Sequence, residues 1–211
     1  MLARRSTAVV AHRAIFEYLP RMDRMRGKLL AMLLAGAGAL SGQGRMAGPR
    51  FAGGNQLVRP EGYRQWVFVG SSLGMSYNEG QAGDAPEFHN VYIQPEAYRQ
   101  FAETGKFPDQ TVLVMEVLSA GGNASINKRG QFEDRFIGIE AAVKDEKRFP
   151  EKWAYFDFIG ASGQALARAK PFPKEACWQC HNQHGAADNV FVQFYPVLRV
   201  ATERPASAHH P

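Results

Sequence analysis

Cys177, Cys180 and His181 form the most chemically specific motif of the chain, Cys-Trp-Gln-Cys-His. Two cysteines separated by two residues and followed directly by a histidine are the attachment signature of a c-type haem. Two thiols one helical turn apart can each add to a vinyl group on the same porphyrin edge, and the adjacent imidazole then binds the iron as its proximal ligand. The sequence therefore predicts one covalently bound haem c, with His181 as the metal ligand.

Two other uses of such a cysteine pair fit less well. A thioredoxin-like redox pair is expected early in a chain, after a first strand and before a helix, whereas this pair lies near the C-terminus. A zinc site needs two further ligands, and His184 is the only other histidine nearby in the sequence. Cys177 and Cys180 are the only cysteines, so none is left for a disulfide elsewhere. Haem is the favoured interpretation.

The N-terminal region predicts export. A short basic segment, residues 22–28, leads into an apolar run, residues 29–40, and then into the small residues 41–44. This order is typical of a secretory signal peptide, and the apolar run is too short to span a bilayer. We expect cleavage between Ala39 and Gly44 and a periplasmic location, which agrees with haem attachment outside the bacterial cytoplasm. Either the leader begins with a long extension or translation starts at Met22 or Met25, and we favour the later start.

The positive charge of the sequence belongs to this leader. The formal net charge is +5, and residues 1–42 hold seven of the 25 Lys and Arg but only two of the 20 Asp and Glu. Residues 43–211 therefore carry no net charge, which gives no argument for a nucleic acid or an anionic membrane as partner. A mature chain of about 165 residues has the size of one domain.

The mature chain is expected to contain a flexible arm, a haem domain and a disordered tail. The arm, residues 43–60, is rich in Gly, Arg and Pro, and the tail covers residues 201–211. In the haem domain, residues 61–200, apolar alternation and β-branched runs predict strands. They are expected at residues 64–69, 90–93, 111–118, 136–143 and 153–159, with loops at 74–87 and 121–130.

Helices are expected to be few. Pro95 and Gly105 delimit a helix over residues 96–103, since proline suits the first turn and glycine the C-terminal end. The haem motif opens a short helix near the C-terminus. The apolar segment 189–198 is expected to be helical, with Pro196 bending or ending it. The predicted fold class is α+β: a β-rich single domain with an antiparallel sheet, a few helices and a C-terminal haem-binding helix.

An ordered set of further segments accompanies the haem motif, namely residues 63–67, 91–96, 138–145, 147–149 and 191–198. With them, residues 62–198 resemble the cytochrome P-460 family, which includes the cytochrome c′-beta proteins. The resemblance implies a β-rich homodimer that holds one c-type haem, with histidine on one face of the iron and an open position on the other. Members of the family either oxidise hydroxylamine or bind nitric oxide.

Three residues take their expected roles from this resemblance. Hydroxylamine-oxidising members carry a lysine cross-linked to the porphyrin in a Val-X-Val-Lys-Glu context, and here Met115 stands at that position, so the cross-link is absent. Glu140 matches the family's distal carboxylate and is the candidate catalytic group, as a proton relay; a salt bridge to a nearby Lys or Arg is the structural alternative. Phe88 lies near the position of an aromatic cap over the open iron site, unless it is an ordinary core residue.

Other residues are possible iron ligands in principle. Met115 as a sixth ligand would make a His/Met electron carrier, although packing against the macrocycle is favoured. His89 is a candidate for the distal pocket, His184 is expected to face solvent, and the tail pair His209 and His210 are poor candidates.

Three functions therefore compete: a haem protein that binds nitric oxide, a redox enzyme acting on hydroxylamine or a similar small nitrogen compound, and an electron carrier with a redox partner protein. The missing lysine favours the first.

Overall fold

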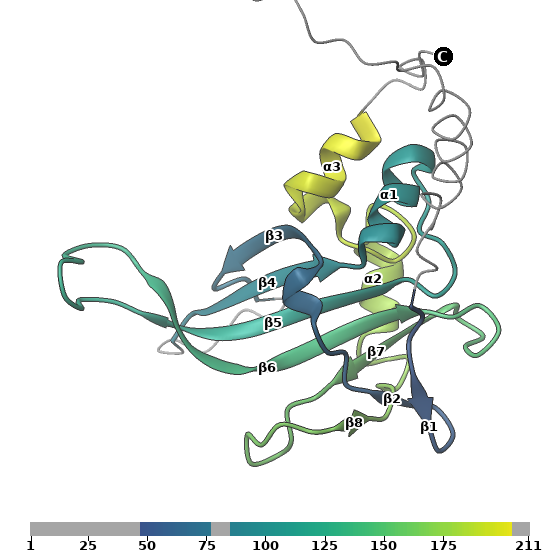
Figure 1. The fold of residues 1–211 in the computed structure, drawn as a ribbon, viewed down its shortest axis with the longest axis horizontal. Coiled ribbons are helices and arrows are strands. Elements are labelled where there is room, and N and C mark those ends of the chain that lie inside the picture. The colour runs from purple at the N-terminus through teal and green to yellow at the C-terminus, as the bar shows by residue number, and fades with distance from the viewer. Residues whose placement is uncertain (1–46, 77–84, 204–211) are drawn as a thin grey trace, which may run out of the picture. The chain divides into compact units, whose positions relative to one another are not determined.

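The computed structural model describes residues 47–76 and 85–203 (Figure 1), all of which belong to one compact unit. The predicted signal peptide, most of the tail, His209 and His210 lie outside the described residues. Within the described residues, no helix is long and apolar enough to cross a membrane.

Five antiparallel strands form the main sheet, in the order β3-β4-β5-β6-β7. Their bounds are Val67–Leu73, Glu87–Ile93, Val112–Gly121, Phe132–Lys144 and Trp153–Asp157. The sheet is a meander, because each strand pairs with the strand that precedes it in the chain. β5 and β6 continue together as a twisted ribbon beyond the other strands (Figure 1). Residues 112–118 of β5 are almost continuously buried, which is typical of a strand covered on both faces.

The two faces of the sheet carry separate apolar clusters. One face packs Ile93, Leu113 and Trp153 against α1 (Pro95–Thr104) and α3 (Pro196–Glu203). The other face packs Val114 and Phe156 against a small second sheet. That sheet has the order β1-β2-β8, with bounds Phe51–Ala52, Gln56–Val58 and Arg168–Ala169.

Three short helical segments complete the fold. α2 (Trp178–His184) contains most of the haem motif, and η2 (Val192–Phe194) leads into α3, while η1 (Tyr63–Gln65) precedes β3. In α1, Pro95 occupies the first turn and Gly105 ends the helix at a φ of 69°, as the sequence predicted. The α+β, β-rich fold class is confirmed.

Two local predictions were wrong. Residues 51–58 were expected to be part of a flexible arm, but they form β1 and β2, because even these short strands bury Leu57 and pair with β8. Pro196 was expected to bend or end a helix, but it begins α3. Proline suits a first helical turn because its missing N–H would have no partner there in any case.

Candidate functional site

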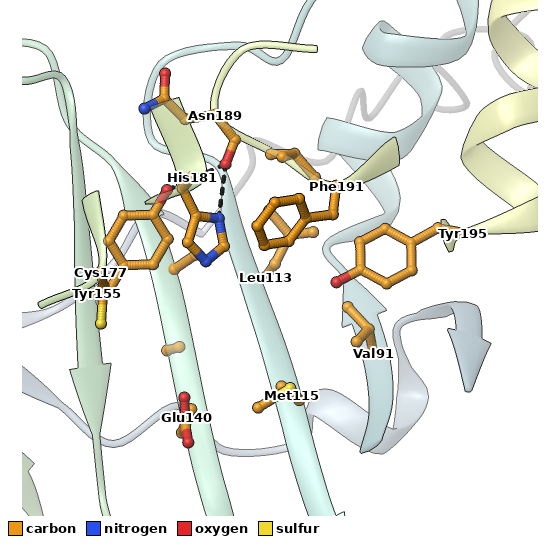
Figure 2. A pocket seen from close by; sticks show the side chains of 13 residues that line it. Val91, Leu113, Met115, Glu140, Tyr155, Cys177, His181, Asn189, Phe191 and Tyr195 are labelled. Carbon is orange, nitrogen blue, oxygen red and sulfur yellow. Dashed lines mark hydrogen bonds between the residues drawn. The ribbon is translucent and has the colours of Figure 1, made fainter. Parts of the chain in front are cut away.

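A cavity lies between the α1/α3 face of the main sheet and the C-terminal segment that carries the motif (Figure 2). The cavity volume is about 100 Å³, and the cavity opens to solvent at its mouth. The sheet contributes Val91, Leu113, Met115, Glu140, Ala141, Ala142 and Tyr155, and the C-terminal segment contributes Cys177, His181, Asn189, Val190, Phe191 and Tyr195.

Strand register explains which side chains reach the cavity. Val91 pairs with Met115, and Met115 pairs with Glu140, across three adjacent strands. Residues paired in this way lie on the same face of a sheet. The resemblance-based pair Met115 and Glu140 is therefore placed side by side on the cavity wall, although 25 positions separate them in the chain.

His181 is held firmly by its surroundings. Its Nδ1 lies 2.9 Å from the backbone oxygen of Asn189, which can only accept, so Nδ1 carries the hydrogen. The ring lies between Tyr155 and Phe191, with centroids 4.2 and 4.3 Å away. Burial lowers the pKa of His181, against the opposing effect of the Asn189 hydrogen bond. A neutral imidazole with its hydrogen on Nδ1 leaves Nε2 free as a metal ligand, and Figure 2 shows this atom directed into the cavity.

Cys177 and Cys180 are half-buried and are not joined in a disulfide. Burial, followed by the nearby Glu140 carboxylate, raises the pKa of the Cys177 thiol to about 11. Reactive redox cysteines have lowered pKa values, so this environment does not suit a thioredoxin-like pair.

The donor set fits a c-type haem. The structure places two free thiols three residues apart, one of them at the cavity, next to an imidazole whose free nitrogen faces the cavity. Cys177 and Cys180 would form the thioether bonds, and His181 would bind the iron. When bound, the haem supplies an iron that takes up small ligands and changes oxidation state.

Glu140 is the one ionisable side chain that the main sheet contributes to the lining of this cavity, apart from Tyr155. Burial raises its pKa to about 7, with smaller contributions from Asp157, its neighbour across β6 and β7, and from Glu87. In the described part of the chain it forms no ion pair with Lys or Arg, in contrast to the salt bridge that was the structural alternative. A carboxyl group that titrates near neutral pH can both donate and accept a proton.

We expect Glu140→Gln to change the pH dependence of stability. The folded-state pKa of about 7 lies above the ordinary glutamate value of 4.5, so the native state binds more protons between these pH values and loses stability as pH rises. Gln cannot ionise. The variant should therefore match the wild type at pH 4 and exceed its free energy of unfolding at pH 8 by up to about 3 kcal/mol.

Urea unfolding of the two proteins at pH 4 and pH 8 measures this difference. Glu103→Gln, at an exposed position of α1, controls for the loss of a carboxylate. An equal difference between Glu140→Gln and wild type at both pH values would contradict the assignment.

The structure does not bring Phe88 to the cavity. In β4 it is three residues from Val91, which lines the cavity, so alternation places the two side chains on opposite faces. The physical reason is that neighbouring residues of a strand point to opposite faces of the sheet.

His89 shares the face of Val91 but is not part of the cavity lining, and its Nε2 lies 3.8 Å from Glu87. His184 is exposed at the end of α2, as expected.

Sequence reasoning missed two residues around His181. Tyr155 packs on the imidazole, and its hydroxyl donates to the same Asn189 oxygen at 3.1 Å. No local sequence pattern distinguishes Tyr155 from the other apolar residues of its predicted strand. Asn189 acts through its backbone, and the only local signal is the turn-forming pair Asp188-Asn189 between apolar residues.

Comparison with known proteins identifies the family. The model of the family described as Cytochrome P460 matches residues 60–192, more than half of the chain. A search of curated proteins found no match. The matched range includes the cavity-lining residues Met115, Glu140 and His181 together with both cysteines. The chain therefore belongs to the Cytochrome P460 family and is a haem-binding cytochrome of that type.

Proposed function

We propose that the chain is an exported mono-haem c-type cytochrome that binds nitric oxide. Cys177 and Cys180 attach the haem, and His181 binds the iron on one face. The observation that carries the proposal is the His181 imidazole, fixed by Asn189 with Nε2 free toward a largely apolar cavity. Among the described residues that line this cavity, His181 is the only imidazole, and Met115 is expected to pack against the macrocycle, so we infer a second iron position that is open to a small ligand.

The cavity wall favours an uncharged ligand. Val91, Leu113 and Met115 present apolar or weakly polar side chains to it. A neutral diatomic molecule loses little solvation on entering such a site, whereas a charged ligand loses much more. Glu140 adds a group whose charge is negative when ionised, which further disfavours anions.

Hydroxylamine oxidation is the second candidate, and Glu140 is the observation that favours it. A carboxyl group with a pKa of about 7 in the cavity wall suits proton transfer from a substrate. Met115 argues against it, because a thioether cannot form the lysine–porphyrin bond of the resembling enzymes. Steady-state assays with hydroxylamine and an artificial electron acceptor separate the two candidates, and sustained turnover would favour the enzyme.

We also propose a homodimer, in line with the family resemblance. Leu73, Phe88, Leu118 and Phe136 form one row across four adjacent strands on the sheet face opposite the cavity. Leu73 is 43% and Phe136 is 44% exposed, so this apolar row reaches solvent in a single chain. Exposed apolar rows of this kind are typical of protein contact surfaces.

One preparation tests export, haem attachment and dimer formation. Protein from a periplasmic fraction should have a denatured intact mass equal to one haem plus the chain that remains after cleavage between Ala39 and Gly44. Light scattering of the native sample should give twice that mass. A denatured mass that retains the leader or lacks haem, or a native mass of one chain, would contradict the corresponding part of the proposal.

A further inference from the structure

The Asn189 oxygen that holds His181 belongs to a tight turn with an unusual backbone. Ala187 and Val190 pair with each other, and between them Asp188 and Asn189 have φ values of 46° and 62°. Two consecutive positive φ values are typical of a type I′ turn, which most often contains glycine at the second central position. Non-glycine residues adopt this region at a cost, so the surrounding structure must maintain it.

The Asp188 carboxylate is anchored to the edge of the main sheet. Lys144 Nζ donates to its Oδ2 at 2.7 Å, and Trp153 Nε1 donates to its Oδ1 at 3.2 Å. Lys144 and Trp153 are directly paired residues of β6 and β7. Both carboxylate oxygens are thus held by two neighbouring strands, although about a third of the Asp188 side chain is exposed.

The ammonium group of Lys144 is buried and has three oxygen partners. Its side chain is only 9% exposed, and Nζ also donates to the Phe107 oxygen at 2.8 Å and lies 3.4 Å from Glu146 Oε1. Three acceptors match the three hydrogens of the ammonium group. A buried ammonium group costs free energy unless it is paired, so this arrangement is a specific one rather than a passing surface contact.

We propose that Lys144, Asp188 and Trp153 form a clamp that positions the proximal ligand. The clamp fixes the Asp188-Asn189 turn on the sheet, and the turn keeps the Asn189 oxygen 2.9 Å from His181 Nδ1. This inference rests on the proposed role of His181 as iron ligand. A hydrogen bond at the second nitrogen of a ligating histidine orients the ring and raises its basicity. The clamp therefore strengthens the bond between histidine and iron and lowers the reduction potential.

The test compares two clamp variants with a matched control in the haem-loaded protein. Lys144→Met removes the cation, and Asp188→Asn removes the charge of the carboxylate while keeping its shape. Glu146→Gln is the control, because it removes the charge of the other acidic partner of Lys144. Among the described hydrogen bonds, Glu146 makes none to the turn. The readouts are the iron–histidine stretching frequency of the reduced protein, by resonance Raman, and the reduction potential.

Both clamp variants should lower the stretching frequency and raise the reduction potential, and Glu146→Gln should change neither. Unchanged values in both clamp variants, with the stretching band present in the wild type, would overturn the clamp alone. Absence of that band in the wild type would overturn the role of His181 itself. If the clamp has a purely structural role, both variants should lower the melting temperature and leave the stretching frequency and the reduction potential unchanged. If Lys144→Met fails to fold, the near-isosteric Asp188→Asn still decides between these outcomes.

Discussion

Replacing His181 with Ala is expected to leave the haem attached to the chain but to remove its proximal ligand. Cys177 and Cys180 are untouched by this change, so the denatured mass should still include haem. Mutation of residues that only hydrogen-bond to a metal ligand typically lowers metal affinity or activity by about 10–100-fold. Loss of the iron ligand itself should have a larger effect. The reduced-state spectrum should therefore change completely, and the iron–histidine stretching band should disappear.

Two additions make this experiment decisive. Free imidazole should enter the space vacated between Tyr155 and Phe191 and restore a spectrum close to that of the wild type. His184→Ala, three residues along the same helix and exposed, should leave the spectrum unchanged. A His181→Ala protein with a wild-type spectrum, or a strong effect of His184→Ala, would assign the ligand to another residue.

Gly185→Ala is expected to destabilise the protein and to loosen the histidine at the same time. A Cβ at Gly185 would lie 2.6 Å from the His181 oxygen and 2.9 Å from backbone atoms of Asn189 and Val190. Backbone atoms cannot move aside as a flexible side chain can, so α2 and the turn must separate. Overpacking of this kind costs about 1–3 kcal/mol.

Chemical denaturation and the iron–histidine stretching frequency measure the two effects of Gly185→Ala. Gly122→Ala is the control, because a Cβ there would meet only the Gly130 oxygen at an ordinary 3.5 Å. Since Gly185 has a normal negative φ of −67°, the expected effect comes from the close approach and not from backbone strain. A Gly185→Ala protein with wild-type stability and an unchanged band would show that α2 and the turn are not in tight contact.

Much of the main sheet could be predicted because its signals are local. The sequence pattern of apolar residues predicts β5, and Pro95 and Gly105 predict the two ends of α1. Neither prediction depends on contacts with the rest of the chain. β1, β2 and β8 are only two or three residues long, too short for any periodic pattern. They exist because tertiary contacts bury Leu57 against the second face of the sheet, which no local window shows.

The site was predictable to a different degree for each residue. Cys177, Cys180 and His181 follow from one contiguous motif. Met115 and Glu140 came from a resemblance, and the strand register then places them together on the cavity wall. Phe88 lies on the sheet face opposite the cavity, which depends on the strand register and not on the residue type. The hydrogen bonds around His181 depend on residues up to 26 positions away and on a backbone oxygen, which residue types do not reveal.

The optical spectrum of the reduced protein, recorded with and without nitric oxide, tests the central claim most directly. Five-coordinate iron bound by His181 predicts a high-spin spectrum at rest that changes on addition of nitric oxide, since no second imidazole lines the cavity in the part of the chain that the structure describes. A low-spin six-coordinate spectrum at rest, insensitive to nitric oxide, would contradict the account and would assign Met115 as a sixth ligand in an electron carrier.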